Sequence, residues 1–158
     1  MLVGAAIGSK VKNYWAIFIL AIISHFILDA IPHWEYAGLA ANASGDAFIA
    51  VTVKALIDIL IGISIIGWLF KSSPLARLVI WGAFFALLPD GLVFTYALAQ
   101  VFFGWQLTFL AGPIAFHNIA HYTDGLNLLF WRIIAEVIIA TASFFVLWQT
   151  RQTVKRHK

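Results

Sequence analysis

The sequence has no cysteine and very little charge. Without cysteine the chain can form neither a disulfide nor a thiolate metal site. Only 11% of its 158 residues are Asp, Glu, Lys or Arg, compared with about 25% in ordinary soluble domains. Apolar residues fill the chain instead: 63% are hydrophobic, and the mean hydropathy is +0.94. This composition excludes a soluble globule and indicates an integral membrane protein with a single domain.

The apolar residues form long runs separated by short polar turns. Runs of about 17 to 25 residues match membrane-spanning helices, whereas barrel strands would be about 10 residues long with alternating polarity. We therefore predict an all-α membrane bundle of four transmembrane helices, over 14–30, 47–70, 78 onward and 126–148. Residues 1–9 are too short to span, which predicts either a re-entrant segment or a helix lying along the bundle.

Two stretches contain residues that interrupt helices. Pro89-Asp90-Gly91 is predicted to break or kink the third span inside the membrane, with 92–103 continuing as a shorter apolar piece. Residues 104–125 contain Gly112-Pro113, which predicts an irregular loop before the last helix. Asp90 is then the deepest acidic residue in the bilayer.

The basic residues lie almost entirely at span ends that four helices would place on one side. They are Lys10, Lys12, Lys71, Arg77, Arg151, Lys155, Arg156 and Lys158. By the positive-inside rule that side is the cytoplasm, so both termini are expected there. Clustering of this kind is a topology signal and does not indicate a nucleic-acid partner. The seven acids, with His25, His33, His117 and His121, are then expected in the outer half of the bilayer or outside it.

The densest chemistry lies in residues 24–36, at the end of the first span. His25 and Asp29 are four positions apart and would share one face of a helix. Pro32 bends or ends that helix and would bring His33 beside them. Imidazole nitrogen and carboxylate oxygen are the ligands that zinc takes when no thiolate is available.

A second histidine pair, His117 and His121, has the same four-residue spacing, as in helical zinc sites. Asp29 and Asp90 have no basic residue at helical spacing, so their charge must be offset in another way. A bound cation would offset it and would also use the histidines at the same depth. We therefore predict one or two metal ions, zinc first and manganese or iron next, bound by His25, Asp29, Asp90, His117 and His121.

Two further intramembrane charge pairs have a structural explanation. Lys54 and Asp58, and likewise Arg132 and Glu136, are four apart and can neutralise each other on one helix. Either acid could alternatively turn inward as a partner for a ligating histidine. Glu136 and His33 are the predicted catalytic acid–base groups.

The segment His25-x-x-x-Asp29-x-x-Pro32-His33 resembles the central motif of zinc-dependent phospholipase C and the S1/P1-type nucleases. With Leu88-Pro89-Asp90 and the membrane setting, the chain is more similar to small membrane-bound metal-dependent hydrolases of prokaryotes. This resemblance implies a location in the prokaryotic plasma membrane. It also implies that His25, Asp29 and Asp90 are ligands, and that His33, His117 and His121 are ligands or acid–base groups.

The expected function is hydrolysis at the outer leaflet, of a phosphate ester in a lipid or lipid-linked substrate. Membrane lipids are the expected partners, and the oligomeric state stays open. One alternative is a protein that binds or transports a divalent metal, although transporters usually need polar groups along the whole path and the inner half here is apolar. The other alternative is a non-enzymatic structural protein, in which the His and Asp side chains are only hydrogen-bonded between helices.

Overall fold

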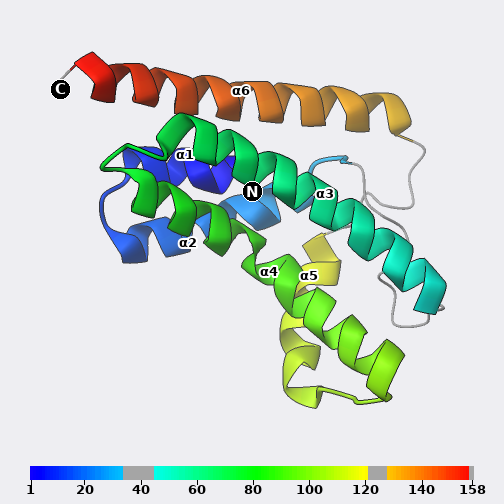
Figure 1. Ribbon diagram of the computed structural model, residues 1–158. Coiled ribbons are helices and arrows are strands. Elements are labelled where there is room, and N and C mark those ends of the chain that lie inside the picture. The colour runs from blue at the N-terminus through cyan, green and yellow to red at the C-terminus, as the bar shows by residue number, and fades with distance from the viewer. Residues whose placement is uncertain (34–44, 121–127, 157–158) are drawn as a thin grey trace.

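A computed structural model describes residues 1–33, 45–120 and 128–156 (Figure 1). The described residues form helices joined by short turns and contain no strand. In chain order the helices are α1 (Leu2–Lys10), α2 (Tyr14–Asp29), α3 (Gly45–Phe70), α4 (Ala76–Phe103), a 3-10 turn (Thr108–Leu110), α5 (Ala111–Ala120) and α6 (Leu129–Arg156). The prediction of an all-α chain is confirmed for this part of the sequence.

Three helices, α3, α4 and α6, are long and apolar enough to cross a membrane. The fourth predicted span, α2, is apolar but has 16 residues. Its length is therefore about 24 Å at 1.5 Å per residue, less than the hydrocarbon thickness of about 30 Å. Large apolar side chains cover the outside of the molecule, including Trp15, Phe109 and Ile119, each more than 70% exposed. Such a surface suits lipid and not water.

The short helix α1 lies along the bundle, packed against α4, α6 and α2. Glycines allow its close approach to α4, because a Cβ atom on Gly4 would clash with the carbonyl oxygen of Gly82. Ala5 of α1 is fully buried in a cluster formed with residues of α3, α4 and α6. Of the two predictions for residues 1–9, the helix lying along the bundle is the one observed.

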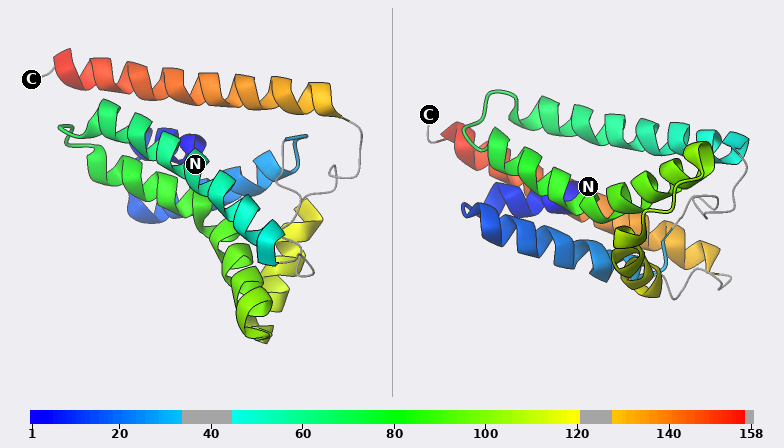
Figure 2. Two further views of the ribbon diagram at one scale, coloured as in Figure 1. Left: turned by 45° about the vertical axis from the view of Figure 1, so that its right-hand side comes forward. Right: turned by 90° about the horizontal axis from the view of Figure 1, so that it is seen from below.

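Helix α4 continues through Pro89 without a break. Proline has no amide hydrogen to donate and pushes against the preceding turn, so a change of direction is expected there. Figures 1 and 2 show that α4 bends near its middle. The predicted kink is therefore present, whereas the alternative of a broken helix is not.

The prediction of an irregular loop over 104–125 is wrong for Ala111–Ala120, which forms α5. Gly112-Pro113 had suggested a helix breaker, but Pro113 is the third residue of this helix. The first four amides of a helix have no partner within it, so Pro113 removes no hydrogen bond, and its fixed φ suits the first turn. α5 packs against α4 and α2, which places His117 on an ordered helix.

Candidate metal centre

Helix α2 turns one row of side chains towards the inside of the bundle. The helix begins at a capped end, where Oδ1 of Asn13 accepts hydrogen bonds from the amides of Trp15 (2.9 Å) and Ala16 (3.1 Å). Its buried residues recur every four positions, as one helix face requires: Ile17, Ala21, His25 and Asp29. His25 and Asp29, the two polar residues of this row, therefore lie at the C-terminal end of an otherwise apolar stripe along α2.

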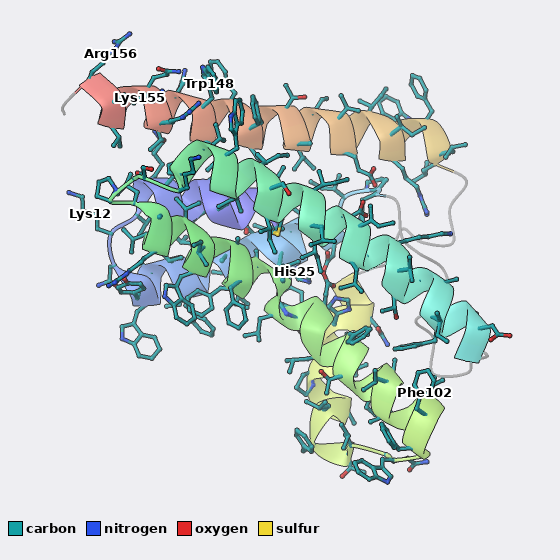
Figure 3. The ribbon with its side chains drawn as sticks, viewed as in Figure 1. Lys12, His25, Phe102, Trp148, Lys155 and Arg156 are labelled. Atoms are coloured by element: carbon teal, nitrogen blue, oxygen red, sulfur yellow. The ribbon has the colours of Figure 1, made fainter. Side chains whose placement is uncertain are left out.

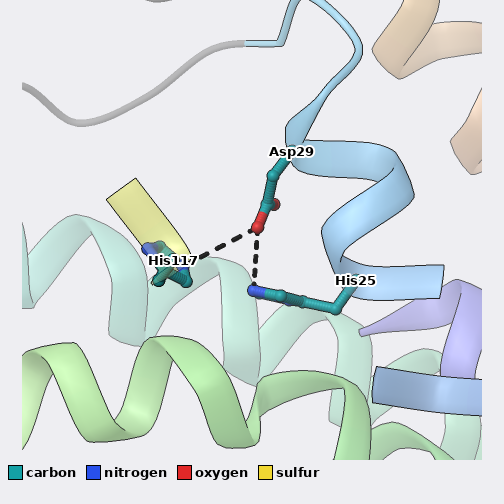
Figure 4. Close-up of side chains that lie close together, drawn as sticks. All are labelled: His25, Asp29 and His117. Atoms are coloured by element: carbon teal, nitrogen blue, oxygen red, sulfur yellow. Dashed lines mark ion pairs between the residues drawn. The ribbon is translucent and has the colours of Figure 1, made fainter. Parts of the chain in front are cut away.

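Four predicted residues, from three helices, meet at this point. Nε2 of His25 lies 3.0 Å from Oδ2 of Asp29 and 3.6 Å from Oδ1 of Asp90. Nε2 of His117 lies 3.7 Å from Oδ2 of Asp29 and 3.2 Å from Oδ1 of Asp90. Two nitrogens and two oxygens thus alternate around a small ring. Figure 4 shows His25, Asp29 and His117 turned towards one another from α2 and α5.

Three residues of the centre are buried, and the side chain of the fourth is exposed. The residues His25, Asp29 and His117 are each only 7% exposed, whereas the side chain of Asp90 is 56% exposed. The start of α1 borders the same place, since the amino group of Met1 lies near enough to Asp90 and Asp29 to interact with both charges. A ligand would therefore reach the centre past Asp90, at the bend of α4.

The spacing of these atoms fits a metal ion. Zinc holds imidazole nitrogen and carboxylate oxygen at about 2.0 to 2.2 Å, so that the ligand atoms of a tetrahedral site are about 3.3 to 3.6 Å apart. The four nitrogen–oxygen distances of 3.0 to 3.7 Å lie close to this range. His25, Asp29 and His117 each offer one ligand atom, all within 4.8 Å of one another, which makes these three the core of the candidate site. The buried Nε2 of His25 pairs with Oδ2 of Asp29 at 3.0 Å, although the contact lacks hydrogen-bond geometry. A nitrogen in this position is suited to ligate a cation.

Aromatic rings hold α2 and α5 together beside the centre. Phe26 of α2 and Phe116 of α5 meet edge to face with ring centroids 4.9 Å apart. The rings of His25 and His117 have centroids 5.4 Å apart. Aromatic packing of this kind fixes the separation of the two helices and therefore of the two imidazoles.

An apolar cleft of about 260 Å³ adjoins the centre, and the sequence did not reveal it. The cleft is lined by side chains of α2, α4 and α5, among them Phe18, Ile22, Phe26, Pro89, Ile114 and His117. Phe18, Ile22 and Phe26 are spaced four apart, which was the available signal. In a helix that is apolar on all sides, however, this spacing does not distinguish a cleft from a lipid-facing row.

The ring does not include the other predicted residues that the structure describes. His33 follows α2, and its Nδ1 is 2.8 Å from the carbonyl oxygen of Ile31. Glu136 is exposed on α6, which packs against α1 and α3. Asp58 is exposed on α3, one turn after the exposed Lys54. His121 lies outside the described residues. The roles predicted for all of these residues stay predictions.

Comparison of the chain with known proteins does not assign it to a family. No protein-family model, curated protein or solved structure matches the chain. The likeness to zinc-dependent phospholipase C, S1/P1-type nucleases and prokaryotic membrane hydrolases is thus carried by the motif residues alone and stays a prediction.

Proposed function

We propose that the chain is a membrane-embedded, metal-dependent hydrolase that acts on a phosphate ester of a lipid or lipid-linked molecule. The observation that carries the proposal is the ring of two imidazole nitrogens and two carboxylate oxygens, 3.0 to 3.7 Å apart, supplied by three helices. Two carboxylates in so apolar a chain require a compensating positive charge. The amino group of Met1 beside Asp29 and Asp90 can supply at most one positive charge. A zinc ion would offset the remaining carboxylate charge, with manganese or iron as the next candidates.

The proposed chemistry divides between the ion and the chain. Zinc bound there would lower the pKa of a water molecule towards neutrality and polarise a phosphoryl oxygen. The chain positions the ligands: α2 fixes His25 and Asp29, while α5 fixes His117. The exposed side of Asp90 leaves room for a substrate oxygen to approach. A carboxylate oxygen not used as a ligand, or His33 just beyond α2, accepts and returns the proton.

We further propose a four-span arrangement in the prokaryotic plasma membrane, with α2 as a short fourth span. Lys12, Lys155 and Arg156 project at one end of the molecule, and His25 lies in its middle (Figure 3). Basic residues at one end support a cytoplasmic location for that end, which includes the C-terminal end of α6, by the positive-inside rule. The amino group of Met1 lies instead beside Asp90 and Asp29 at the centre, so the N-terminus is not part of the basic end. His25 and Asp29 are at the opposite end of α2 from Lys12. The centre would then face the outer leaflet.

The direct test uses the purified full chain in detergent. We expect one or two zinc ions per chain by elemental analysis. We also expect hydrolysis of bis(p-nitrophenyl) phosphate and of phosphatidic acid in mixed micelles. A chelator should abolish both activities, and added zinc should restore them. His117→Ala should lose zinc and activity, whereas Asn118→Ala, the adjacent exposed residue of α5, should keep both.

The alternatives give different results in the same preparation. A chain that binds zinc, hydrolyses neither compound and admits zinc into liposomes would be a transporter. A chain that contains no metal and binds none would be structural. Either result would end the proposal of a hydrolase.

A further inference from the structure

The apolar cleft and the metal centre share one residue. The ring of His117 lines the cleft, while its Nε2 faces Asp29 and Asp90 in the centre. Among the side chains that line the cleft, within the described residues, His117 alone carries polar atoms. The cleft and the centre therefore adjoin at His117, and the other side chains that line the cleft are all hydrocarbon.

The shape of the cleft restricts what it can hold. Phe18, Ile22 and Phe26 form a line along α2, about 12 Å long at 1.5 Å per residue. The volume of about 260 Å³ is below the roughly 300 to 1,000 Å³ of pockets for whole small molecules. A polypeptide segment would leave its backbone groups without partners along apolar walls. A single hydrocarbon chain has no such groups.

We propose that the cleft holds one acyl chain of the lipid substrate, with the ester group at the metal centre. This inference rests on the proposed function and specifies its substrate class: a phospholipid-type monoester or diester whose chain reaches along α2. In this arrangement the acyl chain would lie beside His117, and the phosphate of the same lipid would lie at the metal centre, which His117 also borders. The acyl chain and the headgroup are therefore recognised together. Residues in the middle of the cleft then determine the acceptable chain length.

Ile22 and Ile23 provide a matched pair of test positions. Ile22 lines the cleft between Phe18 and Phe26. Its neighbour Ile23 is 49% exposed on the outer face of α2. Ile22→Trp would fill the cleft with a large ring, whereas Ile23→Trp adds the same ring to the lipid-facing surface. A zinc content equal to that of the wild type shows that each variant folds. If Ile22→Trp loses zinc, Val93→Phe is used instead, because Val93 of α4 also lines the cleft.

The first experiment is photo-crosslinking of the zinc-loaded full chain in detergent. Two probes are compared: phosphatidic acid with a diazirine in one acyl chain, and diacylglycerol with the same chain. Mass spectrometry should locate the phosphatidic acid label on the cleft segments of α2, α4 and α5, several-fold above the diacylglycerol label. Ile22→Trp should reduce this labelling several-fold, and Ile23→Trp should not reduce it.

Three crosslinking results would overturn the inference. Labelling spread evenly over the lipid-facing helices would show that the cleft holds no chain. An equal effect of Ile22→Trp and Ile23→Trp would show the same. Equal labelling by the two probes would identify a structural lipid instead of a substrate.

A kinetic comparison separates failure of this inference from failure of the proposed function. Bis(p-nitrophenyl) phosphate has no acyl chain and reports on the centre alone. Ile22→Trp should lower kcat/KM for long-chain phosphatidic acid several-fold more than for bis(p-nitrophenyl) phosphate. Equal losses for both compounds would reject the cleft as the chain site but keep the hydrolase. A wild type that hydrolyses neither would reject the hydrolase, and any cleft label would then mark a bound lipid only.

Discussion

Nε2 of His117 lies 3.2 Å from Oδ1 of Asp90, although the two residues are 27 positions apart. The contact requires α5 to fold back against α4 beside its bend, directly after Pro89. One backbone feature, the proline in a long helix, thereby sets the position of one candidate ligand. The position of the other candidate ligand, His117, is set by α5. This short helix was not expected in the proline-containing segment 104–125.

The first prediction concerns Asp29. Asp29→Asn should lower zinc affinity by more than the roughly 10- to 100-fold typical of an outer-shell partner, because an amide oxygen lacks the negative charge that the cation requires. Zinc content after dialysis against a metal buffer measures the change. Asp58→Asn, the same substitution on the exposed face of α3, is the control and should keep its zinc. Zinc loss in Asp58→Asn would make Asp58 a ligand.

The second prediction concerns stabilisation by the ion. Zinc at 100 times its Kd should stabilise the fold by about 2.7 kcal/mol, which raises Tm by roughly 5 to 10 °C in a chain of this length. Thermal unfolding of the detergent-solubilised protein with and without zinc measures the shift. His25→Ala should abolish it. Ser24→Ala, which removes a hydroxyl that donates to the carbonyl oxygen of Ala21 (2.8 Å), should retain it. An equal shift in both variants would mean that zinc binds elsewhere.

Much of the fold could be predicted because length and hydropathy determine membrane helices. The expected spans 14–30 and 47–70 correspond to Tyr14–Asp29 and Gly45–Phe70. The last helix continues to Arg156, beyond the predicted end at 148. Its tail is rich in Arg, Gln and Lys, which are good helix formers, so the helix does not stop where the apolar run stops.

Prediction was weaker where tertiary contacts decide the structure. The spacing of His25 and Asp29 indicated a shared face, and their lack of basic partners indicated a meeting with histidines. That Asp90 and His117 join them depends on the bend of α4 and on the packing of α5. Local sequence does not encode that packing, and Gly112-Pro113 pointed away from a helix. The cleft was missed because helices that are apolar all round show no distinct buried face.

The third prediction tests the packing of α1 on α4. Gly82→Ala should destabilise the protein by about 1 to 3 kcal/mol, because the new Cβ would overlap the backbone of Gly4. Gly67→Ala on α3 has no atom within 4 Å of the added Cβ and should be neutral or stabilising by up to about 1 kcal/mol. Unfolding in detergent measures both. Equal stability of the two variants would contradict the close approach of α1 to α4.

The fourth prediction is topological. The chain has no cysteine, so single cysteines can be labelled without background. Lys155→Cys should resist an impermeant thiol reagent in intact cells and react after lysis, since the basic end is expected in the cytoplasm. Gln106→Cys, in the exposed turn after α4, should react in intact cells. The reverse pattern would place the centre in the inner leaflet and remove the outer-leaflet assignment.

The last prediction separates proton transfer from metal binding. His33 follows α2 only four residues after Asp29, whereas Glu136 is exposed on α6. If His33 carries the proton, His33→Gln should lower kcat about 10²- to 10⁴-fold, the usual contribution of general acid–base catalysis. Zinc content and the zinc-dependent rise in Tm should stay unchanged, because His33 would not be a ligand. Loss of zinc in His33→Gln would instead make it a ligand.

Glu136→Gln is the parallel variant, and a comparable loss of kcat with zinc retained would assign proton transfer to Glu136. If neither variant lowers kcat, a carboxylate oxygen of Asp29 or Asp90 that does not bind the metal is the next candidate for the base.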